Sequence, residues 1–248
     1  MGENNLHEDK KQNKADYYDE KEGFLKISLR FIWETLYNFL MILVVVVVIR
    51  TFFVSPFHVS GNSMTDTLSN NDYIIIDKLS YNLMYPDFGD VVVFTPPSPR
   101  IRKVTGIKCL ISKFSKFQFN EDACNIPDFF IKRIIGMPGD TIKIEDGEVY
   151  RNEKQLDEEY LSENNSHRTF VPEKDQVKEY TVPKNSYFVM GDNRNGSSDS
   201  RSYANEWKNY ETGEHAHFIS EESIEGRYLF VLFSPEKVQK FIYSLKGE

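Results

Sequence analysis

One long apolar run dominates the pattern of hydrophobic and polar positions along the chain. Fifteen uncharged residues lie between Glu34 and Arg50, and residues 52–54 extend the apolar character beyond Arg50. About twenty residues are thus available, enough for a helix to cross a bilayer if Arg50 snorkels. A cleaved signal peptide would have its apolar core nearer the N-terminus, and a buried strand would be shorter. We interpret residues 23–54 as a single membrane anchor.

The polar segments beside this run indicate its orientation. Residues 1–22 mix acidic and basic side chains and hold too few apolar residues to form a core, which predicts a disordered tail. Lys21, Lys26 and Arg30 precede the run, whereas Arg50 is the lone base just after it. The positive-inside rule therefore predicts a cytoplasmic N-terminus, with the remaining chain on the outer side of the cytoplasmic membrane.

After the apolar run the pattern changes to short segments rich in β-branched and aromatic residues, separated by turn signals such as Phe88-Gly89-Asp90 and Asp146-Gly147. No long amphipathic helix alternates with these segments, which favours a mainly antiparallel sheet or barrel over βαβ units. Residues 55–248 are long enough for a core and are expected to form one β-rich domain. The expected strands are Tyr73–Asp77, Val91–Phe94, Phe130–Ile135, Thr141–Ile144, Glu148–Arg151, Glu179–Val182, Ser186–Met190 and Gly226–Phe233.

Two stretches of this domain have the character of insertions. Residues 98–128 are rich in Ser, Lys and Phe and hold both cysteines, Cys109 and Cys124, and residues 203–217 are polar. The domain is predicted to face an oxidising compartment, where disulfides persist. We therefore expect a disulfide between Cys109 and Cys124 that closes the first insertion.

Composition limits the classes of function. Forty per cent hydrophobic and 27% charged residues are ordinary for a globular protein. A formal net charge of −8 argues against a nucleic-acid partner. Two cysteines supply neither a disulfide-rich scaffold nor, alone, a zinc site.

Two segments carry residues suited to nucleophilic chemistry. Ser63 lies in a small, turn-prone stretch just after the anchor and is the candidate nucleophile. In the expected strand that holds Lys132, alternation places Phe130 and Ile134 on the same face as the lysine. Desolvation by these neighbours should lower the pKa of the Lys132 amine, and we expect no carboxylate beside it to offset that effect. A neutral lysine can take the proton of a serine hydroxyl.

A third segment, residues 191–201, follows an expected strand and is dense with Asp, Asn, Arg and Ser. Such loops are held together by side-chain hydrogen bonds and Asp–Arg pairs. We expect Asp199 to face Arg201 rather than Lys132. A rigid loop of this kind is suited to positioning catalytic groups.

Taken together, these segments resemble the bacterial type I signal peptidases. The resemblance rests on an N-terminal anchor followed, in order, by four motifs and covers residues 25 to about 235 apart from the two insertions. The motifs read Ser-Met-x-x-Thr-Leu, Gly-Asp-Val-Val-Val-Phe, Lys-Arg-Ile-Ile-Gly-Met-Pro-Gly-Asp and Gly-Asp-Asn-Arg-x-x-Ser-x-Asp-Ser-Arg. By this resemblance Ser63 is the nucleophile and Lys132 the general base. Ser197 would orient the lysine amine, and Asp199 and Arg201 would form a supporting pair.

The resemblance also implies a place for the residues around the nucleophile. Met64 would help to line shallow substrate pockets. Gly61 stands where some members carry a second serine that helps to hold the oxyanion, and Asp66 stands where proline is usual. These departures leave the Ser/Lys pair intact.

The implied function is removal of signal peptides from exported preproteins by cleavage after small residues, in an Ala-x-Ala-like pattern. The implied fold is a coiled, mostly antiparallel β structure set against the membrane surface, and the expected partners are signal peptides and the lipid bilayer. No metal or organic cofactor is implied, and a monomer is expected. Two alternatives remain open: a specialised Ser/Lys processing peptidase for one secreted substrate, and an inactive, membrane-tethered binding module.

Overall fold

The computed structural model describes residues 29–50, 52–97, 101–106, 109, 112, 124–171, 179–203 and 217–246. The chain divides into two units, Met1–Ile49 and Arg50–Glu248. The expected disordered tail, residues 1–22, lies outside the described residues, as do most of the two expected insertions.

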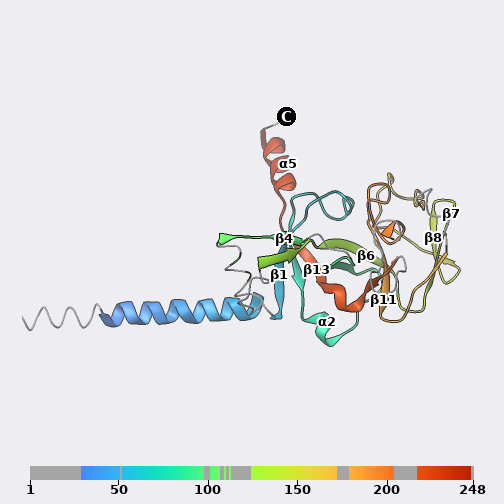
Figure 1. Cartoon of the computed structure of the whole chain (residues 1–248). Coiled ribbons are helices and arrows are strands. Elements are labelled where there is room, and N and C mark those ends of the chain that lie inside the picture. Colours follow the sequence, from blue (N-terminus) through green and yellow to red (C-terminus); the bar gives the residue numbers. More distant parts are fainter. Residues whose placement is uncertain are drawn as a thin grey trace, which may run out of the picture. The chain divides into compact units, whose positions relative to one another are not determined.

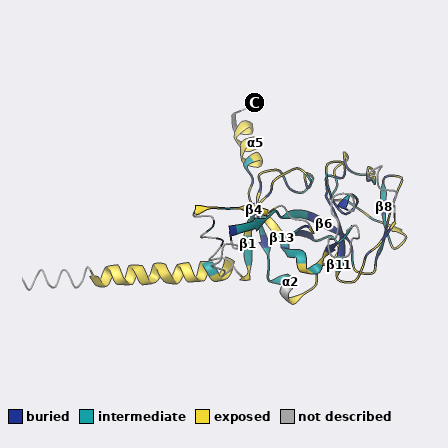
Figure 2. Cartoon of the chain, in the orientation of Figure 1, coloured by how far each residue is buried: buried dark blue, intermediate teal, exposed yellow. Residues whose placement is uncertain are grey.

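The described part of the first unit is an apolar helix, Leu29–Arg50, whose last residue already belongs to the second unit and which lies inside the stretch expected to form the anchor. It has 22 residues and a mean hydropathy of 2.3. Its side chains are almost all exposed, as the yellow helix in Figure 2 shows. By length and composition the helix could cross a membrane. The expected anchor extended to Val54, but in the structure Val54 already begins the first strand of the second unit.

The second unit is built around a seven-stranded sheet in the order β1-β2-β13-β3-β6-β11-β12. Figure 1 labels β1, β13, β6 and β11 of this sheet. Every neighbouring pair in this sheet is antiparallel. β6 lies between β3 and β11, which places it well inside the sheet. The strands are β1 (Val54–His58), β2 (Tyr73–Asp77), β3 (Val91–Phe94), β6 (Phe130–Gly136), β11 (Ser186–Met190), β12 (Ile219–Ser220) and β13 (Ile224–Phe233).

The described residues of this unit also form two smaller antiparallel sheets and a few helical segments. The four-stranded sheet has the order β10-β7-β8-β9, and β4 pairs with β5. These strands are β4 (Ile101–Lys103), β5 (Asn125–Pro127), β7 (Thr141–Glu145), β8 (Glu148–Arg151), β9 (Lys154–Gln155) and β10 (Glu179–Thr181). The helical segments are α2 (Ser80–Leu83), the 3-10 turn η2 (Glu221–Ser223) and α5 (Pro235–Lys246).

The fold class expected from the sequence is confirmed: the second unit is mainly β, and its described strand pairings are antiparallel. All eight expected strands are present, and β2, β3, β8 and β11 have the predicted bounds. β1 was not predicted from the sequence because Pro56 and His58 interrupt its apolar pattern. β9 and β12 have only two residues each, too few for a periodic signal.

The two larger sheets pack closely where β6 leads into β7. Gly136 ends β6, and a Cβ built on it would lie 2.8 Å from Ile142 Cγ1 and 3.0 Å from Phe188 Cβ. A larger residue would push the sheets apart, so glycine is required at this point. The side chains that fill this region form one buried cluster: Ile135, Ile142, Ile144, Val149, Tyr180, Val182, Phe188 and Met190.

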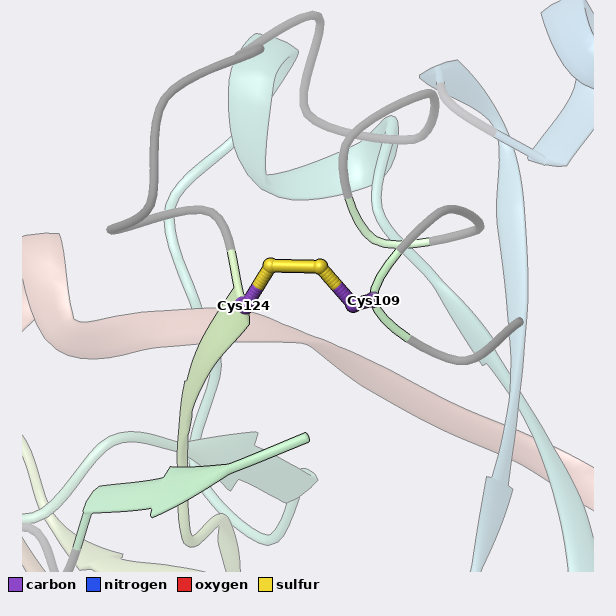
Figure 3. The surroundings of a disulfide bond; sticks show 2 residues. All are labelled: Cys109 and Cys124. Carbon is purple, nitrogen blue, oxygen red and sulfur yellow. A yellow bond between two sulfur atoms is a disulfide. The ribbon is translucent and has the colours of Figure 1, made fainter. Parts of the chain in front are cut away.

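The first expected insertion contains the antiparallel pair of strands β4 and β5 and a disulfide. Figure 3 shows the bond between Cys109 and Cys124, whose Cα atoms lie 4.7 Å apart. The disulfide predicted from the sequence is therefore confirmed. It ties Cys109 to the residue that immediately precedes β5.

Candidate active site

Ser63 is held in a turn whose two sides are fixed in different ways. On one side, Gly61 has a φ of +108°, a conformation that L side chains rarely adopt, and its N–H donates to Asn70 Oδ1 over 2.9 Å. On the other side, Met64 and Leu68 are each only 1% exposed and belong to the core beneath the turn. The hydroxyl of Ser63 is thus presented by backbone that cannot shift without disturbing the core.

Lys132 reaches Ser63 from the middle of β6. Its Nζ donates to Ser63 Oγ over 2.8 Å and to the carbonyl oxygen of Ile131 over 2.9 Å. The sheet pairs Lys132 with Val92 of β3, which is fully buried, and Nζ lies 5.5 Å from the ring centroid of Phe130. The residue is 4% exposed. The apolar environment expected from strand alternation is present.

Burial lowers the pKa of the Lys132 amine from 10.5 to about 8, because an ammonium group loses its hydration there. The charges of Asp199 and Asp192 oppose this shift, and Arg201 adds to it. The expectation that no nearby carboxylate would oppose desolvation was therefore wrong. The reason is that residues 191–201 bring two buried aspartates close to the amine, although their positions in the sequence do not reveal this.

The loop of residues 191–201 packs directly against the turn that carries Ser63. The Asn193 N–H donates to the Ser63 carbonyl oxygen over 3.0 Å, and Asn193 Nδ2 donates to the Asn62 carbonyl oxygen over 2.9 Å. Gly191 lies at the closest approach: a Cβ built on it would be 2.4 Å from Ser63 O and 2.3 Å from Ser197 Oγ. No side chain fits at position 191, so a glycine there allows the two segments to meet.

Ser197 lies beside this contact, but the described structure contains no hydrogen bond of ordinary geometry from it to Lys132. Its Oγ is buried and has no such partner among the described residues. It is nonetheless close to Asp199, whose pKa it helps to lower. Ser197 is therefore brought to the site as the sequence predicts, whereas the expected bond to the amine is not formed.

Two buried aspartates near the amine are each paired with an arginine. Asp199 faces Arg201, as expected, with Nη2–Oδ2 and Nε–Oδ1 distances of 2.7 and 2.8 Å. Burial would raise the pKa of Asp199, but Arg201 and the N–H of Gly191 outweigh it, so its pKa lies below the ordinary value. The second pair was not predicted from the sequence: Arg133 donates two hydrogen bonds of 2.7 and 2.9 Å to the carboxylate of Asp192.

Ser63 and Lys132 open into a cleft of about 540 Å³. An ion pair between Arg102 and Asp128, with an N–O distance of 2.6 Å, lies along the cleft beside strands β4 and β5. The first expected insertion thus contributes to the wall of the site. Apolar side chains along the cleft are those of Phe57, Val59, Ile74, Val93, Phe129, Phe130 and Ile131.

Met64 is placed differently from the expectation that it would line substrate pockets. It is 1% exposed, packs with Leu68, Ile74 and Ile76, and is absent from the cleft lining. The turn directs Ser63 toward the cleft and the next side chain into the core.

Comparison with known proteins places the chain in a family. A family model described as "Signal peptidase, peptidase S26" matches residues 32–233. The chain belongs to this family. It is 35% identical over 187 residues to a probable signal peptidase I-2 of Synechocystis, covering 75% of this chain and 66% of that protein. It is 30% identical over 204 residues to a probable signal peptidase I-1 of the same organism, covering 82% and 84%.

A solved structure of a signal peptidase I from Enterococcus faecalis is 26% identical to this chain. The match covers 58% of this chain and 97% of that one, with a TM-score of 0.35. The chain spans about two thirds of the length of the signal peptidase I-2 of Synechocystis and most of the length of its signal peptidase I-1. Its membership of the signal peptidase family agrees with the resemblance seen in its motifs.

The pairing of Asp199 with Arg201 predicts a large stability effect. Asp199→Asn would leave the Arg201 guanidinium, whose side chain is 5% exposed, without its anionic partner. Loss of one member of a buried pair costs about 3–5 kcal/mol of unfolding free energy. Denaturant titration measures this loss. Glu145→Gln, in the exposed pair with Lys143, is the control and should leave the midpoint unchanged. A loss below about 1 kcal/mol for Asp199→Asn would mean that the pair acts like a surface pair.

Proposed function

We propose that this chain is a membrane-bound serine endopeptidase that removes signal peptides from exported preproteins, with Ser63 as nucleophile and Lys132 as general base. One observation carries the proposal: in a member of the signal peptidase family, a buried amine with a lowered pKa lies 2.8 Å from a serine hydroxyl that opens into a cleft. A surface lysine would remain protonated and could not act as a base at neutral pH.

The reaction is an acyl transfer followed by hydrolysis. The neutral Lys132 amine accepts the hydroxyl proton as Ser63 Oγ attacks the scissile carbonyl carbon. The resulting ammonium then donates a proton to the leaving amine, and the peptide carbonyl stays bound to Ser63 as an ester. Lys132 next takes a proton from water as the water oxygen attacks the ester carbon. The bond between that carbon and Ser63 Oγ then breaks, Lys132 returns the proton to Oγ, and the acyl group leaves as the free acid, which ionises to the carboxylate. The bond to Ile131 O supports this role because it fixes the direction of the amine.

The oxyanion that develops on the scissile carbonyl requires a hydrogen-bond donor. The backbone N–H of Ser63 is the proposed donor, and it makes no hydrogen bond within the described part of the chain. The N–H of Gly61 is unsuitable because it already donates to Asn70. A second donor on a neighbouring serine, present in some members of the family, is replaced here by Gly61.

The cleft supports a substrate bound in an extended form with small apolar side chains near the cut. Its walls combine apolar residues with the edge strand β1, whose backbone is paired on one side by β2. An extended peptide can add to such an edge through main-chain bonds, while pockets select alternate side chains. We propose that cleavage follows small residues, in an Ala-x-Ala-like pattern.

The setting of the enzyme is also part of the proposal. The apolar helix Leu29–Arg50 suits a single-pass anchor, and the excess of basic residues before it supports a cytoplasmic N-terminus. The catalytic domain would then lie on the outer side of the cytoplasmic membrane, in the oxidising setting that suits the Cys109–Cys124 disulfide. All groups of the proposed site come from one chain, which supports a monomer.

Removal of the nucleophile or the base tests the function itself. Purified protein in detergent is mixed with a secretory precursor, and mass spectrometry maps the cut. The wild type should cleave once after a small residue, whereas Ser63→Ala and Lys132→Ala should each lose several orders of magnitude in rate, with non-additive losses. Ser63→Ala that keeps more than a few per cent of the turnover would exclude Ser63 as nucleophile. A wild type that binds precursors without cleaving them would favour the binding module.

The lowered pKa of Lys132 predicts how cleavage depends on pH. The neutral amine is the active form, so kcat/KM should rise with pH and reach half its maximum near pH 8. Only about one amine in a hundred is neutral two units below the pKa, which makes the rise from pH 6 to pH 8 about fifty-fold. Lys132→Arg should be inactive throughout because its guanidinium stays protonated. A flat profile between pH 6 and pH 8 would contradict the assignment of Lys132 as the base.

The orientation can be tested with a protease added to intact spheroplasts. It should digest the part of the chain after Val54 and spare the part before Phe31, because the positive-inside rule keeps the basic flank in the cytoplasm. Immunoblotting with tags at each end reports which part survives, and lysed spheroplasts are the control. Digestion of the N-terminal part alone would show the reverse orientation.

A further inference from the structure

Asp66, three residues after Ser63, makes a set of contacts to a distant part of the chain. Its Oδ2 accepts hydrogen bonds from the Ser162 N–H over 2.8 Å and from Asn165 Nδ2 over 3.0 Å. Its Oδ1 accepts a hydrogen bond from the Ser162 hydroxyl over 2.8 Å. Within the described part of the chain Asp66 makes no ion pair, so its contacts are hydrogen bonds alone. The carboxylate therefore ties the turn that carries Ser63 to the turn at residues 162–165.

The turn at residues 162–165 also contacts the loop that carries Ser197. Asn165 is 6% exposed, and its Oδ1 accepts the N–H of Asn195 over 3.5 Å. The Asn195 side chain donates in turn to the Asn164 carbonyl oxygen over 3.4 Å. These two bonds are long, but they involve the same turn that binds Asp66. One short turn thus bridges the loops of Ser63 and Ser197.

Residues on either side of this turn make stronger contacts to the same loop. Arg194 has a fully buried side chain, and its Nη1 donates to Glu158 Oε2 over 2.8 Å and to Thr169 Oγ1 over 2.7 Å. The ring of Tyr160 lies under the guanidinium of Arg133, 4.0 Å from its carbon atom. We refer to residues 158–169 as the brace segment.

The brace segment contacts all three sequences that supply the proposed catalytic groups. It reaches the Ser63 turn through Asp66, the Lys132 strand through Arg133, and the Ser197 loop through Arg194 and Asn195. Its contacts to Arg133 and Arg194 involve buried or partly buried side chains that anchor it firmly. The contact to Asp66 is the one that lies nearest to the nucleophile in sequence.

We propose that Asp66 is a positioning residue, whose carboxylate holds the Ser63 turn against the brace segment so that Oγ stays aligned with Lys132. The proposal rests on the proposed function, since alignment has consequences only if Ser63 reacts. Loss of the carboxylate would leave the buried Asn165 Nδ2 and the Ser162 N–H without their acceptor. The turn would then relax, and displacement of a reacting group by about 1 Å can cost about a hundredfold in rate.

The chemistry of the contacts distinguishes between two substitutions at this position. Asn can keep one acceptor oxygen at the Oδ2 position, and its amide can donate to the Ser162 hydroxyl, so Asp66→Asn retains most of the network. Asp66→Ala retains none of it. Asp157, an exposed aspartate just before the brace segment with no described contact, gives the matched control Asp157→Ala.

Steady-state cleavage of a precursor peptide by these variants is the first test. Asp66→Ala should lower kcat about tenfold or more and leave KM within twofold of wild type. The midpoint of the pH profile should not change, because Asp66 is not among the charges that shift the pKa of Lys132. Asp66→Asn and Asp157→Ala should stay within threefold of wild type. Asp66→Ala within twofold of wild-type kcat, or Asp66→Asn as slow as Asp66→Ala, would overturn the proposal.

Hydrogen exchange measured by mass spectrometry is the second test, and it does not require activity. Asp66→Ala should speed exchange in peptides that cover residues 60–68 and 193–197, where the Asn193 N–H is bound to Ser63 O, and Asp157→Ala should not. Unchanged exchange in both peptides would overturn the proposal. If the wild type cleaves no precursor, the proposed function fails, and the exchange result still decides whether Asp66 holds the turn. If Asp66→Ala does not fold, Ser162→Ala replaces it in both tests. We then expect a twofold to threefold loss of kcat. If Ser162→Ala changes neither kcat nor the exchange rates, the proposed role of Asp66 is contradicted.

Discussion

The burial of one lysine amine in the middle of a sheet is the constraint on which the rest of the site depends. An amine at 4% exposure on β6 has lost most of its hydration, and this loss alone moves its pKa toward neutrality. Its neighbours are consistent with such burial: β3 and β11 flank β6, the buried Val92 is its partner in the sheet register, and the Phe130 ring centroid lies 5.5 Å from Nζ. A strand at the edge of the sheet would leave the same lysine in water.

Carboxylates near a buried amine work against this effect, and the structure limits them by pairing each with an arginine. Asp192 and Asp199 both raise the pKa of Lys132, yet Arg133 and Arg201 bind their oxygens at 2.7 to 2.9 Å. An aspartate that already has an arginine partner attracts the lysine proton less strongly than a free one. The ion pairs therefore have two effects. They hold the loop of residues 191–201 in place, and they limit how far the two aspartates raise the pKa of the Lys132 amine.

Several polar contacts of the Ser63 turn come from segments that are distant in the sequence. Asn193 binds the carbonyl oxygens of Ser63 and Asn62, and Asp66 binds the brace segment. Beneath the turn Met64 and Leu68 supply apolar anchors. The Ser63 hydroxyl at the surface of the cleft is in this way supported by buried apolar side chains on one side and by hydrogen bonds on the other. The disulfide-linked insertion adds the Arg102–Asp128 pair to the cleft wall.

The sequence by itself determined the apolar helix and the eight strands with a clear apolar pattern, and its motifs singled out the candidate site residues. Periods of two and long apolar runs record which side chains are buried, so β2, β3, β8 and β11 and the neighbours of Lys132 could be predicted. The motifs identified Ser63, Lys132, Ser197 and the Asp199–Arg201 pair. Only the tertiary structure decided that Met64 faces the core, that Ser197 makes no described bond to the amine, and that two carboxylates lie near Lys132. It alone brought Asp66 to Ser162 and Arg133 to Asp192. Local patterns report burial and turn chemistry, whereas contacts between loops depend on how the sheets bring distant segments together.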